Sequence, residues 1–122
     1  MKHSPAFQAL CEDAQKNVKE ISAQETQQKI ELGQTLVFDV REDHEVAQGL
    51  IAGAKHLGRG IIERDIENLV PDKQQEIILY CGGGYRSALA AVNLQKMGYG
   101  KILSMAGGWR TWKELSLPTQ QP

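Results

Sequence analysis

One stretch of the sequence contains residues whose types and spacing suit nucleophilic chemistry. It follows the apolar run Ile77–Tyr80 and consists of Cys81, Gly82, Gly83, Gly84, Tyr85, Arg86 and Ser87, which we call the cysteine loop. Because glycine reaches positive φ at little steric cost, three glycines allow the chain to fold back and turn backbone N–H groups toward the sulfur. These amides and the Arg86 cation favour the thiolate over the thiol, so the pattern predicts a nucleophilic cysteine.

A simpler interpretation of the cysteine loop is that Cys81 ends a buried strand and the glycines only turn the chain. Arg86 weighs against it, because a fixed cation five positions after Cys81 would lie over the same loop. A nucleotide site is not indicated, since the glycines fit neither the GxGxxG nor the GxxxxGK[ST] spacing.

The segments around this loop alternate between patterns typical of strands and of helices. Strands are expected at 36–40, within 49–57, at 77–80 and at 101–105; helices at 5–18, 22–33, 61–69, 85–97 and after Gly107; and a charged loop at 41–45. This alternation predicts an α/β domain with a mainly parallel central sheet and helices on both faces. Chemistry in such sheets gathers beyond the carboxyl ends of the strands, where the pattern places Cys81, Arg41 and Gly107.

Length and charge restrict the classes of function. The chain has 122 residues, enough for one domain, and its net charge is −1 with acidic and basic residues interspersed. We therefore expect no nucleic-acid partner and no membrane partner, since each would need a basic patch or a long apolar run. The first residues do not resemble a secretory signal, and two cysteines make no disulfide framework, so we expect a cytoplasmic protein.

The second cysteine, Cys11, has a structural interpretation. It lies on an apolar stripe of a helix that Ser4 caps and Pro5 begins; the stripe is Phe7, Leu10, Cys11, Ala14 and Val18. A buried free cysteine behaves as a small hydrophobic residue, so we expect Cys11 to pack in the core. The alternative is a resolving thiol that reaches Cys81 during turnover.

Several motifs together resemble a known family. They are the cysteine loop, Asp39-Val40-Arg41-Glu42, the segment Glu45-x-x-x-Gly49-x-Ile51-x-Gly53-Ala54, Gly107-Gly108-Trp109, Trp112 and Leu117-Pro118. In order and spacing the chain resembles a single-domain rhodanese, a thiosulfate or persulfide sulfurtransferase. The resemblance covers residues 21–118 and leaves 1–20 as an N-terminal helical extension and 119–122 as a C-terminal tail. Leu50 and Ala52 depart from the His and Pro that the family often has.

The resemblance implies a two-step reaction through Cys81. The thiolate would take the outer sulfur of thiosulfate or a persulfide donor, and cyanide or a thiol would then collect it in ping-pong fashion. Amides of residues 82–87 would hold the anionic sulfur, and Arg86 would attract and orient the dianionic donor. No cofactor and no metal are required.

Three other interpretations are open at this stage. A phosphatase or arsenate reductase on the same fold would need one more residue between Cys81 and Arg86, and Tyr80 replaces the histidine that often precedes a phosphatase cysteine. A regulatory binding module generally lacks the loop cysteine. In a sulfur relay, the persulfide would form but the physiological donor or acceptor would be another protein.

The remaining residues receive supporting roles. We expect Asp39 and Arg41 to brace neighbouring loops through hydrogen bonds, with Arg41 facing the pocket or lying in a solvated turn. Arg59 either adds positive field near the site or is an exposed arginine. The histidines, His3, His44 and His56, are interpreted as surface or loop residues. Trp109 and Trp112 are expected to pack the last helix onto the sheet.

Overall fold

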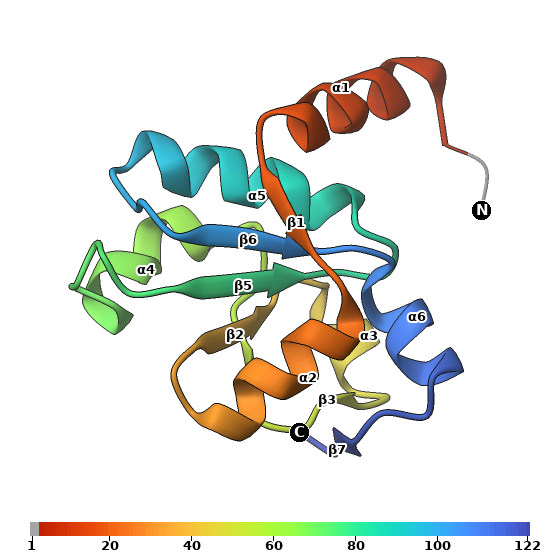
Figure 1. The fold of residues 1–122 in the computed structure, drawn as a ribbon. Helices are drawn as coiled ribbons and strands as arrows, with labels where there is room; N and C mark the ends of the chain where they lie inside the picture. Colours follow the sequence, from red (N-terminus) through yellow and green to blue (C-terminus); the bar gives the residue numbers. More distant parts are fainter. Residues whose placement is uncertain (1–2) are drawn as a thin grey trace.

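A five-stranded sheet forms the centre of the fold (Figure 1). The computed structural model describes residues 3–122. In spatial order the strands are β1 (Lys19–Ile21), β6 (Ile102–Met105), β5 (Ile77–Tyr80), β2 (Leu36–Asp39) and β4 (Lys55–His56). All four neighbouring pairs are parallel, which confirms the predicted parallel sheet.

Helices cover both faces of this sheet, as predicted (Figure 1). One face carries α4 (Ile62–Leu69) and α5 (Tyr85–Lys96), and α1 (Pro5–Lys16) packs on the outside of α5. The other face carries α2 (Ala23–Leu32), α3 (Asp43–Val46) and α6 (Gly108–Glu114). None of the helices in residues 3–122 has the length and apolar character needed to cross a membrane.

Strand β5 joins the two halves of the core. Its four residues, Ile77 to Tyr80, are fully buried, as a continuous apolar run predicts for a central parallel strand. Ile77 and Leu79 pack beneath α4 and α5, whereas Ile78 and Tyr80 pack beneath α2 and α6. Cys81 therefore follows the most completely buried strand of the sheet.

Two helix starts agree with their expected caps. The Ser4 hydroxyl accepts a hydrogen bond from the N–H of Phe7 at 3.3 Å, and the Ser22 hydroxyl accepts one from Glu25 at 3.1 Å. Gly33 ends α2 in the left-handed conformation, with φ of 70°. These local signals correctly predict the start of α1 and both ends of α2.

Two expectations for residues 41–57 were wrong. The expected charged loop at 41–45 contains the short helix α3, because Glu42 and Glu45 form a capping box that satisfies its first amides. The single strand expected within 49–57 is two strands, β3 (Leu50–Ile51) and β4, which belong to different sheets.

The chain ends also differ from the sequence interpretation. β1 was not predicted, and residues 19 and 20 of the proposed extension belong to it. The tail at 119–122 contains β7 (Thr119–Gln120), which pairs antiparallel with β3. On α1, Leu10 is 57% exposed and Val18 lies beyond the helix, so the apolar stripe of Cys11 and Ala14 is narrower than expected.

Candidate active site

Cys81 lies directly after β5 at the carboxyl edge of the sheet, and it is fully buried. Its Sγ accepts hydrogen bonds from the backbone amides of Gly84, at 3.1 Å, and Ser87, at 3.4 Å. The Ser87 hydroxyl lies 3.5 Å from the same sulfur. Because amide donors stabilise negative charge on sulfur, this arrangement can hold a nucleophilic thiolate or the terminal sulfur of a persulfide.

The three glycines of the cysteine loop differ in role. Only Gly84 has a positive φ, of 105°, at the position that caps α5. At Gly82 a Cβ atom would lie 3.3 Å from Nη2 of Arg86, and at Gly83 it would meet no atom within 4 Å. The tight turn thus depends on Gly84, whereas Gly82 leaves room for the Arg86 guanidinium.

Helix α6 holds the start of the cysteine loop in place. The N–H of Trp109 donates to the carbonyl of Cys81 at 2.8 Å, and that of Arg110 donates to the carbonyl of Gly82 at 3.1 Å. The two backbones approach so closely that a Cβ atom at Gly108 would overlap the Cys81 carbonyl oxygen. Gly108 therefore permits the contact that fixes the first turn of the loop.

A second serine supports the sulfur from strand β6. The hydroxyl oxygens of Ser87 and Ser104 lie 2.8 Å apart, and both residues are fully buried. Sequence reasoning missed Ser104, although a polar residue within the apolar run Ile102–Met105 was the available signal. The Ser104 hydroxyl orients that of Ser87, which in turn lies against Cys81.

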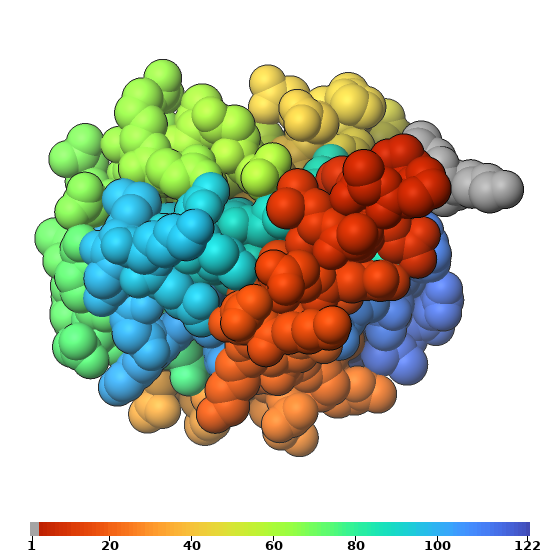
Figure 2. Space-filling view, turned by 90° about the horizontal axis from the view of Figure 1, so that it is seen from above, coloured from red at the N-terminus to blue at the C-terminus, as the bar shows by residue number. Residues whose placement is uncertain are grey.

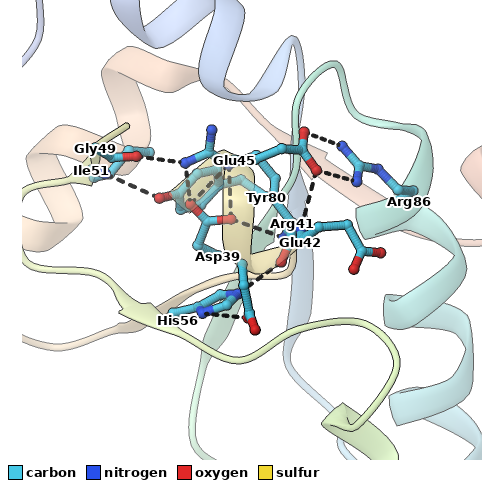
Figure 3. A network of polar contacts seen from close by, with 10 residues as sticks. Asp39, Arg41, Glu42, Glu45, Gly49, Ile51, His56, Tyr80 and Arg86 are labelled. Carbon is cyan, nitrogen blue, oxygen red and sulfur yellow. Dashed lines mark hydrogen bonds and ion pairs between the residues drawn. The ribbon is translucent and has the colours of Figure 1, made fainter. Parts of the chain in front are cut away.

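Arg86 is paired with a carboxylate of the chain, a contact that the sequence did not predict. Its guanidinium donates to Glu45 on α3 through Nη1 to Oε1, at 2.8 Å, and Nη2 to Oε2, at 3.0 Å (Figure 3). These bonds lower the pKa of Glu45 from 4.5 to about 2, and the same carboxylate raises the pKa of Arg86. Glu45, to which sequence reasoning gave no role, therefore balances the cation of the loop.

Asp39 and Arg41 form a second, fully buried ion pair at the end of β2. Nη2 of Arg41 lies 2.7 Å from Oδ2 of Asp39 and also donates to the carbonyl of Gly49 at 2.8 Å. The guanidinium packs 4.6 Å from the ring centroid of Trp109 on α6. This places Arg41 between the end of β2, the turn at Gly49 and helix α6 rather than in a solvated turn. Trp109 packs on this arginine as well as on the core.

Two further side chains extend this network (Figure 3). The Tyr80 hydroxyl accepts a hydrogen bond from the N–H of Ile51 at 3.0 Å, and burial together with the charge of Asp39 raises the pKa of Tyr80. His56 is half-buried, and its Nε2 donates to the carbonyl of Arg41 at 2.8 Å. The expectation that His56 is a surface or loop residue was therefore wrong, because His56 is half-buried in strand β4.

The N-terminal helix covers the first turn of α5. Phe7 and His3 pack against the ring of Tyr85, with centroids 6.2 and 5.3 Å from it. Cys11 is fully buried against Ala88 and Leu89, in agreement with a packing role. Burial and the charge of Cys81 raise the pKa of Cys11, which places this thiol within the electrostatic field of the candidate site.

Known proteins are similar to this chain in sequence and in fold. A family model described as the rhodanese-like domain matches residues 22–115. YtwF of Bacillus subtilis is 37% identical over 102 residues, which cover 83% of this chain and 96% of that protein. A protein of Allochromatium vinosum named sulfurtransferase is 31% identical over 106 residues, covering 86% of this chain and 97% of that protein.

Solved structures agree over nearly the whole chain. The polysulfide-sulfur transferase homodimer of Wolinella succinogenes has a TM-score of 0.81 at 26% identity, covering 96% of this chain and 88% of that one. RPA3614 of Rhodopseudomonas palustris, described as a protein of unknown function and possible tyrosine phosphatase, has a TM-score of 0.86 at 23% identity and covers 98% of both chains. At that identity the second likeness concerns the fold alone.

Proposed function

The chain belongs to the rhodanese-like domain family of sulfurtransferases, and on that premise we propose that Cys81 carries a sulfane sulfur from thiosulfate or a persulfide donor to a thiophilic acceptor. The observation that carries this proposal is the pair of amide hydrogen bonds to Cys81 Sγ within a loop that closes at Ser87. Such donors stabilise an anionic sulfur without any cofactor.

With thiosulfate the reaction has two balanced steps. The Cys81 thiolate attacks the outer sulfur, a new S–S bond forms, and sulfite leaves with the electron pair of the bond that breaks. Cyanide or a thiolate then attacks the terminal sulfur of the persulfide, and the Cys81 thiolate is the leaving group. Sulfite departs before the acceptor binds to the sulfur-loaded enzyme, so the kinetics are ping-pong.

Two properties of the loop favour sulfur over phosphate as the transferred group. Four residues separate Cys81 from Arg86, one fewer than in the phosphatase loop of the same fold, and the cation at its end is paired with Glu45. The loop therefore offers a smaller and less positive cradle than a phosphate ester needs. If this protein hydrolysed phosphate esters and failed to transfer sulfur from thiosulfate to cyanide, the ranking would be reversed.

We place the reaction in the cytoplasm, where thiols are kept reduced. Its partners would be a small sulfur donor and a small thiol, cyanide or a protein thiol as acceptor. A protein acceptor would make the chain a sulfur relay, and sulfur transfer from the loaded enzyme to several acceptors would distinguish these roles.

Intact-mass measurement tests the proposal. After incubation with thiosulfate, the wild-type protein and a Cys11→Ser variant should each carry one added sulfur atom, and a Cys81→Ser variant should carry none. An adduct that persists in Cys81→Ser, or is lost in Cys11→Ser, would contradict the assignment of Cys81. A wild-type protein that gains no sulfur from thiosulfate or from a low-molecular-weight persulfide would instead favour a binding module.

A further inference from the structure

A polar side chain interrupts the apolar face of the sheet that α5 covers. Because side chains of a strand alternate between its two faces, Ser104 lies on the same face as Ile102, which packs in the core beneath α4 and α5. Ser104 is fully buried there. Figure 2 shows α1 lying across α5, so where the two helices cross, this face is covered by two layers of helix. A hydroxyl in such a place needs its hydrogen-bond partner within the protein.

Three buried groups form a hydrogen-bonded chain that ends at Ser104. Within residues 3–122, the side-chain hydroxyl of Ser104 has one hydrogen-bond partner, the hydroxyl of Ser87 at 2.8 Å. The Ser87 hydroxyl lies 3.5 Å from Sγ of Cys81, and all three residues are fully buried. The chain therefore has two links, one between the hydroxyls and one to the sulfur, and Ser104 is its inner end.

The number of hydrogens available to these two links depends on the charge of the sulfur. With a Cys81 thiolate, Ser104 donates to Ser87 and Ser87 donates to the sulfur, so both hydroxyl hydrogens are used. With a Cys81 thiol, three hydrogens compete for two links, and one of them is left without an acceptor in a buried place, which costs free energy. A bond received from Ser104 also polarises the Ser87 hydroxyl and strengthens its donation to an anion.

We propose that Ser104 is a positioning residue for the reaction, which acts through the Ser87 hydroxyl to stabilise the anionic sulfur of Cys81. The amides of Gly84 and Ser87 are donors that the backbone fixes, whereas the Ser87 hydroxyl can rotate, and Ser104 determines its direction. Ser104 itself touches neither the sulfur donor nor the acceptor. The inference rests on the proposed function for its part in turnover, since the thiolate that Ser104 favours is the group that attacks the donor.

The pH profile of Cys81 alkylation tests this proposal. A Cys11→Ala background leaves Cys81 as the only thiol of the chain, so its rate of reaction with iodoacetamide follows the fraction of thiolate. In that background we expect Ser104→Ala to move the midpoint of the profile upward by about half a pH unit, because a bond that favours the anion is lost. At a pH below the midpoint, the alkylation rate should then fall about threefold.

Two substitutions that are matched in shape separate the hydroxyl from its packing. Ser104→Thr and Ser104→Val add the same bulk, and the threonine side chain alone keeps a hydroxyl. Ser104→Thr should hold the midpoint near that of the background protein, whereas Ser104→Val should shift it as Ser104→Ala does. Ile102→Val, which trims a buried side chain on the same face of β6, is the control for packing and should leave the midpoint unchanged.

A double-mutant cycle tests whether Ser104 acts through Ser87. Ser87→Ala should raise the midpoint by itself, and Ser104→Ala added to it should cause no further shift. The proposal is overturned if Ser104→Ala leaves the midpoint unchanged, if Ser104→Val behaves as Ser104→Thr does, or if the shifts of the two single alanine variants add up in the double variant.

Sulfur transfer gives an independent measurement. At a pH below the midpoint, Ser104→Ala should lower kcat/KM for the sulfur donor by about the same factor as the alkylation rate, and the loss should shrink at a pH above it. A protein whose alkylation profile depends on Ser104 but which gains no sulfur would contradict the proposed function and leave the hydrogen-bonded chain standing. Sulfur transfer by a protein whose alkylation profile does not depend on Ser104 would contradict only the inference.

Discussion

Glu45 and Arg86, 41 residues apart in the sequence, face each other in a two-point ion pair that ties α3 to the cysteine loop. Each side chain is only about 30% exposed, at 28% and 29%. The pair lies against Gly82, where added bulk would meet Nη2 of Arg86 first and Oε2 of Glu45 next. The position of the loop therefore depends on a charge from a distant part of the chain.

The first prediction concerns stability in acid. The pKa of Glu45 is lowered to about 2 in the folded protein from 4.5, so the pair stabilises the fold fully above pH 4.5 and loses its effect as the pH falls toward 2. A Glu45→Gln variant should show a shallower loss of unfolding free energy over that range, by roughly 1–2 kcal/mol after solvent screening. Denaturant titrations from pH 7 to pH 2 measure it.

The control for this prediction is Glu31→Gln, which removes an exposed carboxylate on α2. It tests whether the loss of any surface carboxylate changes the dependence of the unfolding free energy on pH below pH 4.5 in the same way. If the profile of Glu45→Gln runs parallel to that of the wild-type protein, the ion pair does not contribute to acid stability as argued.

The second prediction compares a buried with an exposed ion pair. Asp39→Ala leaves the Arg41 charge buried without a partner, and we expect it to lower the unfolding free energy by about 3–5 kcal/mol. Asp65→Ala breaks the exposed pair with Arg64 and should leave the unfolding free energy close to that of the wild-type protein. Chemical denaturation of both variants at neutral pH makes the comparison, and equal losses would remove the bracing role of Asp39.

The cysteine loop could be predicted from the sequence because its determinants are local. The apolar run that ends at Cys81, the glycine that caps α5 and the helix that follows all lie within about a dozen residues. The same holds for Ser22 and Gly33, which bound α2 by short-range hydrogen bonds. In each case the groups that determine the backbone conformation lie within a few residues of one another.

Features that depend on distant contacts could not be predicted. The charge of Arg86 is balanced by Glu45, the hydroxyl of Ser87 is oriented by Ser104, and neither partner is close in sequence. β1 was missed because a three-residue strand with two exposed residues has no period, and it exists through its pairing with β6. Leu10 lies at a position of the apolar helical pattern. Because α1 packs on α5 rather than on the sheet, its side chain is nevertheless exposed.

The last prediction concerns the contact between α6 and the cysteine loop. Gly108 has φ of 53°, and a Cβ atom there would overlap backbone atoms of Cys81 and Gly82, which cannot rotate away as a side chain can. Gly108→Ala should therefore lower the unfolding free energy by at least about 2 kcal/mol. Because the overlap displaces the Cys81 carbonyl, persulfide formation should also slow in the fraction that remains folded.

Gly83→Ala is the matched variant for stability, since it adds the same methyl group to the same loop. A Cβ atom at Gly83 meets nothing within 4 Å and the residue has no positive φ, so the change in unfolding free energy should stay within about 0.5 kcal/mol. Thermal and denaturant unfolding of the two variants, run beside the wild-type protein, measure the difference. If Gly108→Ala unfolds at the same denaturant concentration as Gly83→Ala, the close approach of α6 does not fix the loop, and the hydrogen bonds from Trp109 and Arg110 can form with Cβ present.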